Sequence, residues 1–274
     1  MGSPETATRR LNIAQSFNPI GSILGILMSK YFILDNISLY SVSGTYATLG
    51  CVLLVILVIM LFAKMPTGKD LEKQDSVRAS FSRLLTNRLY RNGVVAQFFY
   101  VGAQIGVWSF TIRIVMQELG ILEAEASTIY LITIIGFCLS RFVYTWLMKW
   151  IAPSRLLAAG GVLSTLMALT VVLSAGTGWF MVTALILISV FMSLMFPTIY
   201  GISLENVSPE DSTLGASFLV MAIVGGSILP PLQGSIIDLG TVCAHPAVNV
   251  SFCLPLLCFL VIILYGIRSA RRMK

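Results

Sequence analysis

Charged side chains are scarce in this sequence, and their scarcity decides its class. Asp, Glu, Lys and Arg together make up 11% of the 274 residues, and there is one histidine. Soluble globular domains usually carry about 25% charged residues, so the chain lies far outside that range. Apolar residues make up 57% of the chain, and its mean hydropathy is +0.89. The composition therefore predicts an integral membrane protein.

Acidic residues are also missing from the middle of every long apolar run. The 12 Asp and Glu residues fall in expected loops or at the ends of the runs, and the single histidine, His245, falls in an expected outer loop. A membrane enzyme acting on lipid or peptide bonds would need a carboxylate, a histidine or a metal cluster at membrane depth. The sequence also lacks phosphate-binding loops and nucleophile elbows. We therefore expect no enzyme activity, no cofactor and no metal site.

The cysteines do not form a pattern of paired residues. There are five, an odd number, and Cys51, Cys138, Cys253 and Cys258 fall inside apolar runs. Cysteines in such runs behave as small hydrophobic residues. No disulfide framework is therefore expected.

Long apolar runs fill most of the chain. A transmembrane helix needs about 20 mostly apolar residues, whereas the strands of a membrane barrel alternate with a period of two. That alternation is not seen here, so the fold class that we predict is all-α integral membrane with eight transmembrane helices. The predicted spans are Leu11–Ile33, Thr45–Met65, Asn92–Gln117, Ser127–Lys149, Leu156–Ala175, Trp179–Ser203, Ser212–Ile236 and Val248–Ile267.

The basic residues lie almost entirely on one side of these spans. All of the 18 Lys and Arg residues except Lys30 and Arg113 fall at the termini or in loops that follow an even number of spans. Cytoplasmic loops of membrane proteins carry such an excess, so we predict that both termini are cytoplasmic. The same rule accounts for the formal charge of +6, and no nucleic-acid partner is expected.

One long polar loop, from Pro66 to Arg91, divides the chain unequally. Residues 1–65 hold two predicted spans and residues 92–274 hold six. Many secondary transporters consist of two six-helix halves with the substrate site near the bilayer midplane. On that pattern the chain corresponds to helices 5–12 of a twelve-helix transporter.

Within this loop, the segment Ser76–Leu89 separates apolar from basic side chains. That separation predicts an amphipathic helix lying at the membrane surface. The apolar side carries Phe81, Leu84 and Leu85, and the basic side carries Arg78, Arg83 and Arg88.

The first predicted span contains amides, which are costly in lipid unless they find a partner. Gln15 and Asn18 lie at helical spacing with Ser22 and Gly25, so they share one face. On the twelve-helix pattern this face would line a central cavity. Packing explains Asn18 equally well, because an Asn before Pro19 can satisfy a backbone group that the proline disturbs.

Larger polar side chains recur in the third predicted span. Gln97, Tyr100, Gln104 and Trp108 follow one another at steps of three and four and share a face. At a rise of about 1.5 Å per residue, Gln104 falls near the bilayer midplane. An amide bonds to vicinal hydroxyls and an indole stacks on a sugar ring, so this face predicts a neutral sugar as substrate. The alternative is that Tyr100 and Trp108 are packing aromatics.

Glycines and prolines late in the chain indicate where helices bend. Pro197 and Pro230 interrupt two predicted spans, and Gly225 with Gly226 precedes the second proline. Such bends permit either gating or close packing. Tyr200 lies one turn beyond Pro197 and is a further candidate for lining the cavity.

Five blocks of the sequence together resemble a known family. In chain order they are RRLNIAQSFNPIGSI, VVAQFFYVGAQIGVWSFTIR, GFCLSRFVYTWLMKWIAPSRLLAA, FMSLMFPTIYGISLEN and GASFLVMAIVGGSILPPLQGSIID. In order and extent they are similar to the L-fucose:proton symporters of the major facilitator superfamily. Related glucose/galactose permeases share many of them.

The resemblance implies a monomeric sugar carrier of a bacterial inner membrane that takes up L-fucose with a proton. In that family, proton coupling and much of the sugar recognition rest on acidic residues of the first and fourth helices, which precede the region matched here. The resemblance therefore implies a fragment truncated at its N-terminus, which is not expected to transport alone. Arg141 resembles the loop motif that holds helices of one half together, which implies a conformational role.

One departure from the family pattern leaves the sugar open. The resemblance implies a tyrosine before the Pro-Thr-Ile sequence, where this chain has Phe196. A glucose/galactose-type permease is therefore an alternative, as is a remnant or sensor that keeps the fold without transporting. Uptake by this chain alone would separate a carrier from a remnant, because alternating access needs two halves.

Overall fold

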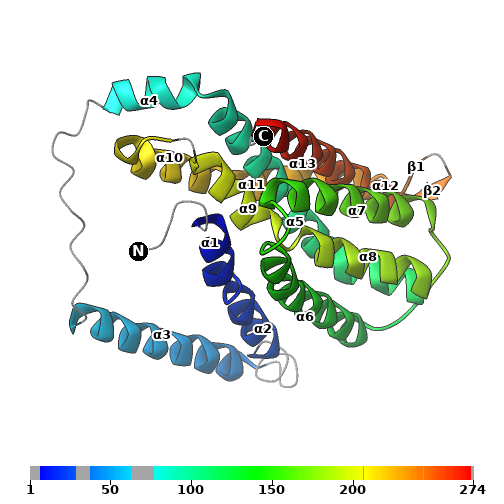
Figure 1. The fold of residues 1–274 in the computed structure, drawn as a ribbon. Helices are drawn as coiled ribbons and strands as arrows, with labels where there is room; N and C mark the ends of the chain where they lie inside the picture. The colour runs from blue at the N-terminus through cyan, green and yellow to red at the C-terminus, as the bar shows by residue number, and fades with distance from the viewer. Residues whose placement is uncertain (1–6, 29–37, 63–76, 206, 243, 273–274) are drawn as a thin grey trace. The chain divides into compact units, whose positions relative to one another are not determined.

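The computed structural model describes residues 7–28, 38–62, 77–205, 207–242 and 244–272, which are almost entirely helical (Figure 1). The chain divides into two compact units, one of residues 1–19 and 75–274 and the other of residues 20–74. The predicted division into residues 1–65, 66–91 and 92–274 stays a prediction, because residues 63–76 lie outside the described ranges.

The elements follow one another along the chain with short connections. The helices are α1 (Ala7–Gln15), α2 (Asn18–Met28), α3 (Leu39–Phe62), α4 (Val77–Thr86), α5 (Arg88–Leu119), α6 (Glu123–Leu147), α7 (Pro153–Leu173), α8 (Trp179–Met192), α9 (Met195–Leu204), α10 (Pro209–Met221), η3 (Ala222–Val224), α11 (Gly225–Ile237), α12 (Ala247–Val250) and α13 (Cys253–Arg272). Two short strands, β1 (Thr241–Val242) and β2 (His245–Pro246), pair antiparallel before α12.

Seven helical stretches among the described residues are long and apolar enough to cross a membrane. Each overlaps one of the second to eighth predicted spans, with ends shifted by a few residues. The all-α membrane architecture is therefore confirmed. The stretches are Tyr40–Phe62, Arg88–Leu119, Glu123–Leu147, Pro153–Leu173, Trp179–Leu204, Pro209–Ile237 and Ala247–Arg271.

Two predicted spans are broken by proline. Within Leu11–Ile33, α1 ends at Gln15 and α2 begins at Asn18, while residues 29–33 lie outside the described ranges. Within Trp179–Ser203, α8 ends at Met192 and α9 begins at Met195. A proline has no N–H to donate to the carbonyl four residues earlier, and its ring crowds that carbonyl. The prediction of a continuous helix is wrong at both places for this reason.

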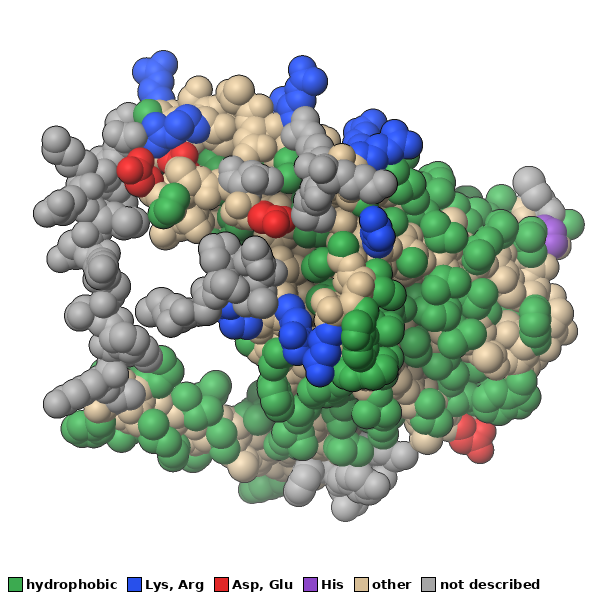
Figure 2. All heavy atoms as spheres, viewed as in Figure 1, with side chains coloured by type: hydrophobic (Ala, Val, Ile, Leu, Met, Phe, Trp, Pro, Cys, Tyr) green, Lys and Arg blue, Asp and Glu red, His purple; other side chains and the backbone are tan. Residues whose placement is uncertain are grey.

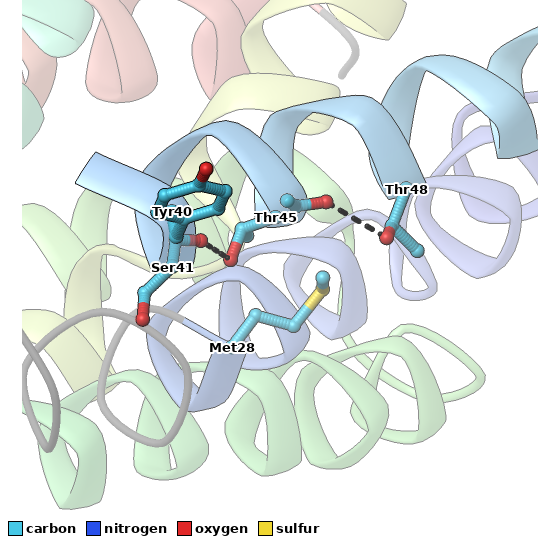
Figure 3. Close-up of a pocket in the computed structure, with 6 residues that line it drawn as sticks. Met28, Tyr40, Ser41, Thr45 and Thr48 are labelled. Carbon is cyan, nitrogen blue, oxygen red and sulfur yellow. Dashed lines mark hydrogen bonds between the residues drawn. The ribbon is translucent and has the colours of Figure 1, made fainter. Parts of the chain in front are cut away.

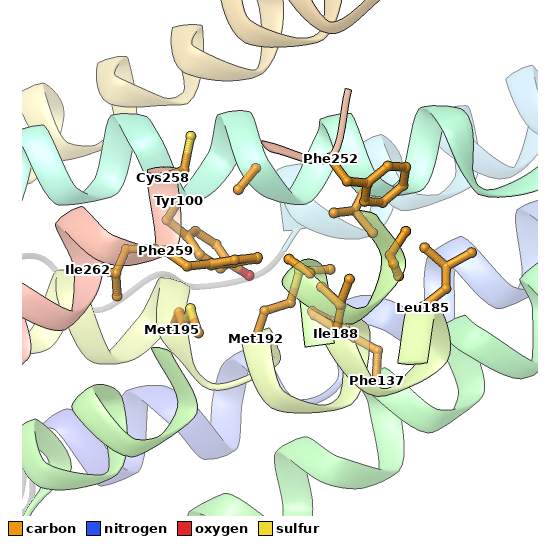
Figure 4. Packing of buried hydrophobic residues seen from close by; sticks show 14 of the residues in the cluster. Tyr100, Phe137, Leu185, Ile188, Met192, Met195, Phe252, Cys258, Phe259 and Ile262 are labelled. Carbon is orange, nitrogen blue, oxygen red and sulfur yellow. The ribbon is translucent and has the colours of Figure 1, made fainter. Parts of the chain in front are cut away.

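The interior of the larger unit is built around α5, which packs against α6, α9, α11 and α13. Large apolar side chains from these helices and from α8 are completely buried. Tyr100, Phe137, Met192 and Phe259 lie together among them (Figure 4). A core of this kind fixes α5, so its polar side chains have defined surroundings.

Two glycines let neighbouring helices approach closely. A Cβ atom at Gly225 of α11 would overlap the backbone carbonyl oxygen of Phe98 in α5. A Cβ atom at Gly266 of α13 would lie 2.9 Å from the backbone nitrogen of Ala158 in α7. At both contacts the obstacle is backbone, which cannot rotate away, so only glycine fits.

The amphipathic helix predicted over Ser76–Leu89 is confirmed as α4, but its faces differ from the prediction. Leu84 is buried, whereas Phe81 and Leu85 are 41% and 46% exposed. Arg83 does not lie on a purely solvated basic face. Its Nε and Nη2 atoms donate to the two carboxylate oxygens of Asp211 at 2.8 and 2.7 Å.

Asp211 is the buried partner in this ion pair, and it lies in the first turn of α10. The Ser208 hydroxyl caps that turn by accepting a hydrogen bond from the Asp211 backbone N–H. The Tyr90 hydroxyl of α5 also donates to the carbonyl oxygen of Gly215 at 2.8 Å. α4 and the start of α5 are therefore fastened to one end of α10.

The smaller unit contains most of α2 and all of α3. It has a shallow pocket of about 260 Å³ lined by Met28, Tyr40, Ser41, Gly44, Thr45 and Thr48 (Figure 3). The Thr45 and Thr48 hydroxyls donate to carbonyl oxygens one turn earlier, at 2.8 and 2.9 Å. Because these polar groups are already satisfied within α3, we assign no binding site here.

Candidate functional site

A buried arginine, Arg141 of α6, joins three helical segments of the larger unit. Its side chain is 5% exposed. Its Nε atom donates to the carbonyl oxygen of Ser193 at 2.8 Å, and its Nη1 atom donates to the carbonyl oxygen of Gln15. Its guanidinium carbon lies 4.8 Å from the centroid of the Phe137 ring, a favourable distance for a cation over an aromatic face.

Both carbonyl groups that Arg141 binds have lost their helical partner to a proline. Pro19 follows Gln15 by four residues, and Pro197 follows Ser193 by four residues. In an unbroken helix the N–H at positions 19 and 197 would donate to these two carbonyls. Proline supplies no N–H. One guanidinium group therefore satisfies two helix breaks that lie far apart in the sequence.

The same geometry explains how a cation can be buried here. Among the described residues Arg141 makes no ion pair, although a buried charge normally needs one. Gln15 ends α1, and Ser193 is the C-cap of α8. Helix C-termini carry partial negative charge, so two of them together stabilise the guanidinium.

Asn12 is a polar contact between α1 and α9 that the sequence analysis did not assign to the site. Its Nδ2 atom donates to the Thr8 carbonyl oxygen at 2.8 Å and lies 3.4 Å from the Thr198 hydroxyl. Gly201 lies against Thr8, where a Cβ atom would come within 2.6 Å of the Thr8 hydroxyl oxygen. These contacts and Arg141 dock α1 onto α6 and α9.

The polar face predicted along α5 is divided by burial. Gln97 and Tyr100 are completely buried, and Gln104 and Trp108 are partly exposed. Neither amide atom of Gln97 has a hydrogen-bond partner among the described residues, and the Tyr100 hydroxyl has none either. The Tyr100 hydroxyl lies close enough to Arg141 for an electrostatic interaction. Buried amides without a partner are rare and costly, which marks Gln97 as a position with an unfilled hydrogen-bonding role.

Trp108 bridges α5, α6 and α8. Its indole N–H donates to the Ser189 hydroxyl at 3.2 Å. Its ring meets Phe137 edge to face, with centroids 5.0 Å apart. Since Arg141 lies over the same Phe137 ring, Trp108 and Arg141 are connected through one aromatic side chain.

The other predicted cavity residues lie in different surroundings. Gln15 is half-buried, and the Arg141 contact uses its backbone rather than its amide. Asn18 is exposed at the first position of α2. Tyr200 is half-buried and packs with the cluster around Leu84, which belongs to the α4 and α10 side of the unit. The structure therefore does not bring Tyr200 together with Trp108.

The predicted bending residues in α11 have different neighbours. Gly225 is buried against the α5 backbone, and Gly226 faces the side chains of Ile105 and Val101. Pro230 is buried inside α11. A 3₁₀ segment, η3, immediately precedes Gly225, and such segments often mark hinges.

Asn12 and Ser193 could have been identified from one signal in the sequence. A proline inside an apolar span leaves the carbonyl four residues earlier without a donor, which points directly to Gln15 and Ser193. The donor, Arg141, is more than 50 residues from either. No periodicity along one helix could have paired it with them.

Comparison with known proteins gives a consistent family relationship. The family model described as Major Facilitator Superfamily matches residues 2–231. An L-fucose-proton symporter of Haemophilus influenzae is 43% identical over 305 aligned positions, covering all of this chain and 70% of the relative. A glucose/galactose transporter of Brucella abortus is 28% identical and covers 99% of this chain and 66% of the relative.

The fold is similar to that of a solved transporter. The structure of a variant of the Escherichia coli fucose:proton symporter FucP aligns with a TM-score of 0.83 and 30% identity. The alignment covers 98% of this chain and 70% of FucP. The chain thus spans about two thirds of the length of these relatives.

Proposed function

The chain belongs to the Major Facilitator Superfamily, and on that basis we propose that it forms part of a bacterial inner-membrane carrier that moves L-fucose together with a proton. The observation that carries this proposal is the 43% identity to an L-fucose-proton symporter over the whole of this chain. In the proposed orientation both termini face the cytoplasm, as the distribution of basic residues suggests. The carrier works as a monomer in the lipid bilayer.

A hexose such as glucose or galactose is the second candidate substrate. It is favoured by the more distant glucose/galactose transporter and by Phe196, which lies with its ring centroid 6.2 Å from that of Tyr100. A phenylalanine there offers no hydroxyl to a sugar, so this position distinguishes the chain from the pattern of the fucose symporters. Competition between the sugars for uptake decides between the candidates.

In the proposed site, Gln104 and Trp108 contact the sugar and Gln97 with Tyr100 support them from the interior. Gln104 and Trp108 are the partly exposed members of the α5 face. The Gln104 amide would donate to and accept from neighbouring hydroxyls, while the indole covers the apolar face of the ring. Gln15, Asn18 and Tyr200 remain candidate contacts from other segments.

The gating elements proposed for the transport cycle are Arg141, Pro197, Gly225, Gly226 and Pro230. Arg141 holds α1 against α6 and α9 through a contact that exists only while these helices are packed together. A carrier must break and remake such contacts as it exposes its site alternately to the two sides. We place this arginine at a contact that opens during the cycle.

Proton coupling is assigned to groups outside this chain. The acidic side chains here lie in loops or at the ends of spans, and buried Asp211 is paired with Arg83. A paired carboxylate at a helix start is poorly placed to carry a proton through the middle of the bilayer. The complete carrier, and not this chain alone, is therefore the object to test.

Replacing Gln104 with alanine in the full-length protein is expected to weaken L-fucose binding by about 1–3 kcal/mol, because a hydroxyl of the bound sugar loses its partner. The measurement is L-fucose uptake into proteoliposomes, recorded together with alkalinisation of the medium. The expected change is a higher KM with little change in kcat.

The matched control is Ser109→Ala, an exposed position on a different face of α5, which is expected to leave KM unchanged. Uptake without alkalinisation would remove proton coupling from the proposal. Complete absence of uptake in well-folded protein would favour the remnant or sensor. An unchanged KM in Gln104→Ala would reduce Gln104 to a packing residue.

A further inference from the structure

Four arginines line one pocket at the basic end of the larger unit. The pocket has a volume of about 530 Å³ and lies between the start of α5 and the end of α13. Figure 2 shows blue Lys and Arg side chains along the edge of the molecule where Figure 1 places α4 and the end of α13. The lining residues are Arg88, Leu89, Arg91, Asn92, Tyr265, Arg268 and Arg271.

The charges in this pocket are not balanced by protein groups. None of the four guanidinium groups makes an ion pair or a hydrogen bond with another described residue, and the ion pair of Arg83 with Asp211 involves neither α13 nor the start of α5. Like charges gathered around one cavity repel each other, and an anion within it removes that cost. The side chain of Asn92, half-buried in the same pocket, also has no hydrogen-bond partner among the described residues.

The chemistry of the lining selects phosphate among anions. The basic residues in the pocket are all arginine, whose planar guanidinium binds two phosphate oxygens at once. Arg88 is also the first residue of α5, so the positive end of that helix dipole adds to the field. The floor is closed by Leu89 and Tyr265, and the Tyr265 hydroxyl is already engaged with Ser203 at 2.9 Å.

A second, more apolar pocket adjoins the first through a shared residue. It has a volume of about 450 Å³ and is lined by Arg155, Ala158, Ile267, Ala270 and Arg271. It lies between α7 and α13, which approach closely where Gly266 meets Ala158. Both helices are membrane-spanning stretches that end near this pocket. A charged chamber that continues into an apolar groove at the end of membrane helices matches a molecule with a phosphate head and hydrocarbon tails.

We infer that the two pockets together bind an anionic phospholipid of the phosphatidylglycerol or cardiolipin class. Its phosphodiester lies among Arg88, Arg91, Arg268 and Arg271, and its glycerol backbone and acyl chains follow the groove between α7 and α13. Basic pockets between membrane helices on the cytoplasmic side bind such headgroups. The inference depends on the proposed orientation of the membrane spans and does not depend on which sugar is carried.

The test is lipid binding by the purified protein in neutral detergent, measured by native mass spectrometry. Phosphatidylglycerol is expected to bind as a discrete one-to-one adduct, and phosphatidylcholine at the same concentration is not. Arg91→Gln with Arg268→Gln, one residue from each helix, is expected to weaken phosphatidylglycerol binding about 30-fold, since each arginine near an anionic headgroup contributes about a factor of five. Arg91→Lys with Arg268→Lys keeps the charge and is expected to lose less.

The matched control is Arg78→Gln with Lys149→Gln, which removes the same charge from two exposed positions outside both pockets. This control is expected to retain binding. Equal loss in the control would overturn the inference, because general positive charge would then explain the adduct. Competition by inorganic phosphate at concentrations that displace the lipid completely would also overturn it, in favour of a soluble anion. The assay requires no sugar, so its failure leaves the proposed transport function untouched.

Discussion

Gly225→Ala is expected to destabilise the larger unit severely, by roughly 3 kcal/mol or more, because the added methyl group must occupy the space of a backbone carbonyl. The carbonyl belongs to Phe98 of α5, the central helix of the core. Neither helix can adjust by rotating a side chain, so α11 must move away from α5. Thermal unfolding of the purified protein in detergent measures the effect, with monodispersity on size-exclusion chromatography as a second readout.

The neighbouring glycine provides a control at almost the same depth. A Cβ atom at Gly226 would lie 3.0 and 3.2 Å from side-chain methyl and methylene carbons of Ile105 and Val101. These side chains can give by a few tenths of an ångström, so Gly226→Ala is expected to cost about 1 kcal/mol or less. Equal stability of the two variants would show that α11 does not pack against the α5 backbone as described.

Arg141→Met is expected to release α1 from the rest of the larger unit. The substitution keeps a long apolar side chain but leaves the Ser193 and Gln15 carbonyls without a donor. A buried carbonyl left without a partner costs roughly 1–3 kcal/mol, and here there are two. Hydrogen exchange followed by mass spectrometry is expected to show faster exchange in α1 and around Ser193, with α5 and α13 unchanged.

A second substitution distinguishes this explanation from a general loss of packing. Pro197→Ala restores an N–H that can donate to Ser193, so it is expected to recover part of the stability that Arg141→Met removes. The same Pro197→Ala change in the protein that retains Arg141 is expected to bring little gain, because Ser193 already has a donor. Additive effects of the two substitutions would contradict the assignment of Arg141 as the donor that replaces the proline N–H.

The fold was predictable to the extent that it depends on local sequence. Long apolar runs located the membrane helices, and the separation of Leu84 from Arg78 along 14 residues located the helix of the linker. The ion pair between Arg83 and Asp211 was not predictable, since these residues are 128 positions apart. Nothing in the periodicity of either helix records the partner.

The site was predictable in composition but not in depth. A helical wheel correctly placed Gln97, Tyr100, Gln104 and Trp108 on one side of α5, yet it could not tell which of them faces neighbouring helices. That depends on where α9 and α13 cross α5, and these crossings bury Gln97 and Tyr100 completely while leaving Gln104 and Trp108 partly exposed. The role of Arg141 was likewise suggested by resemblance, but its two carbonyl partners required the three-dimensional structure.

The most direct measurement of the central claim is the accessibility of Gln104 to water and its protection by sugar. Gln104→Cys and Gln97→Cys are made in the full-length protein after the five native cysteines are replaced, and each is labelled with a membrane-impermeant thiol reagent. The account predicts that the cysteine at position 104 reacts, that L-fucose slows its reaction, and that the cysteine at position 97 does not react. Labelling at position 104 that sugar does not change, or no labelling there in any condition, would contradict a sugar site on this face of α5.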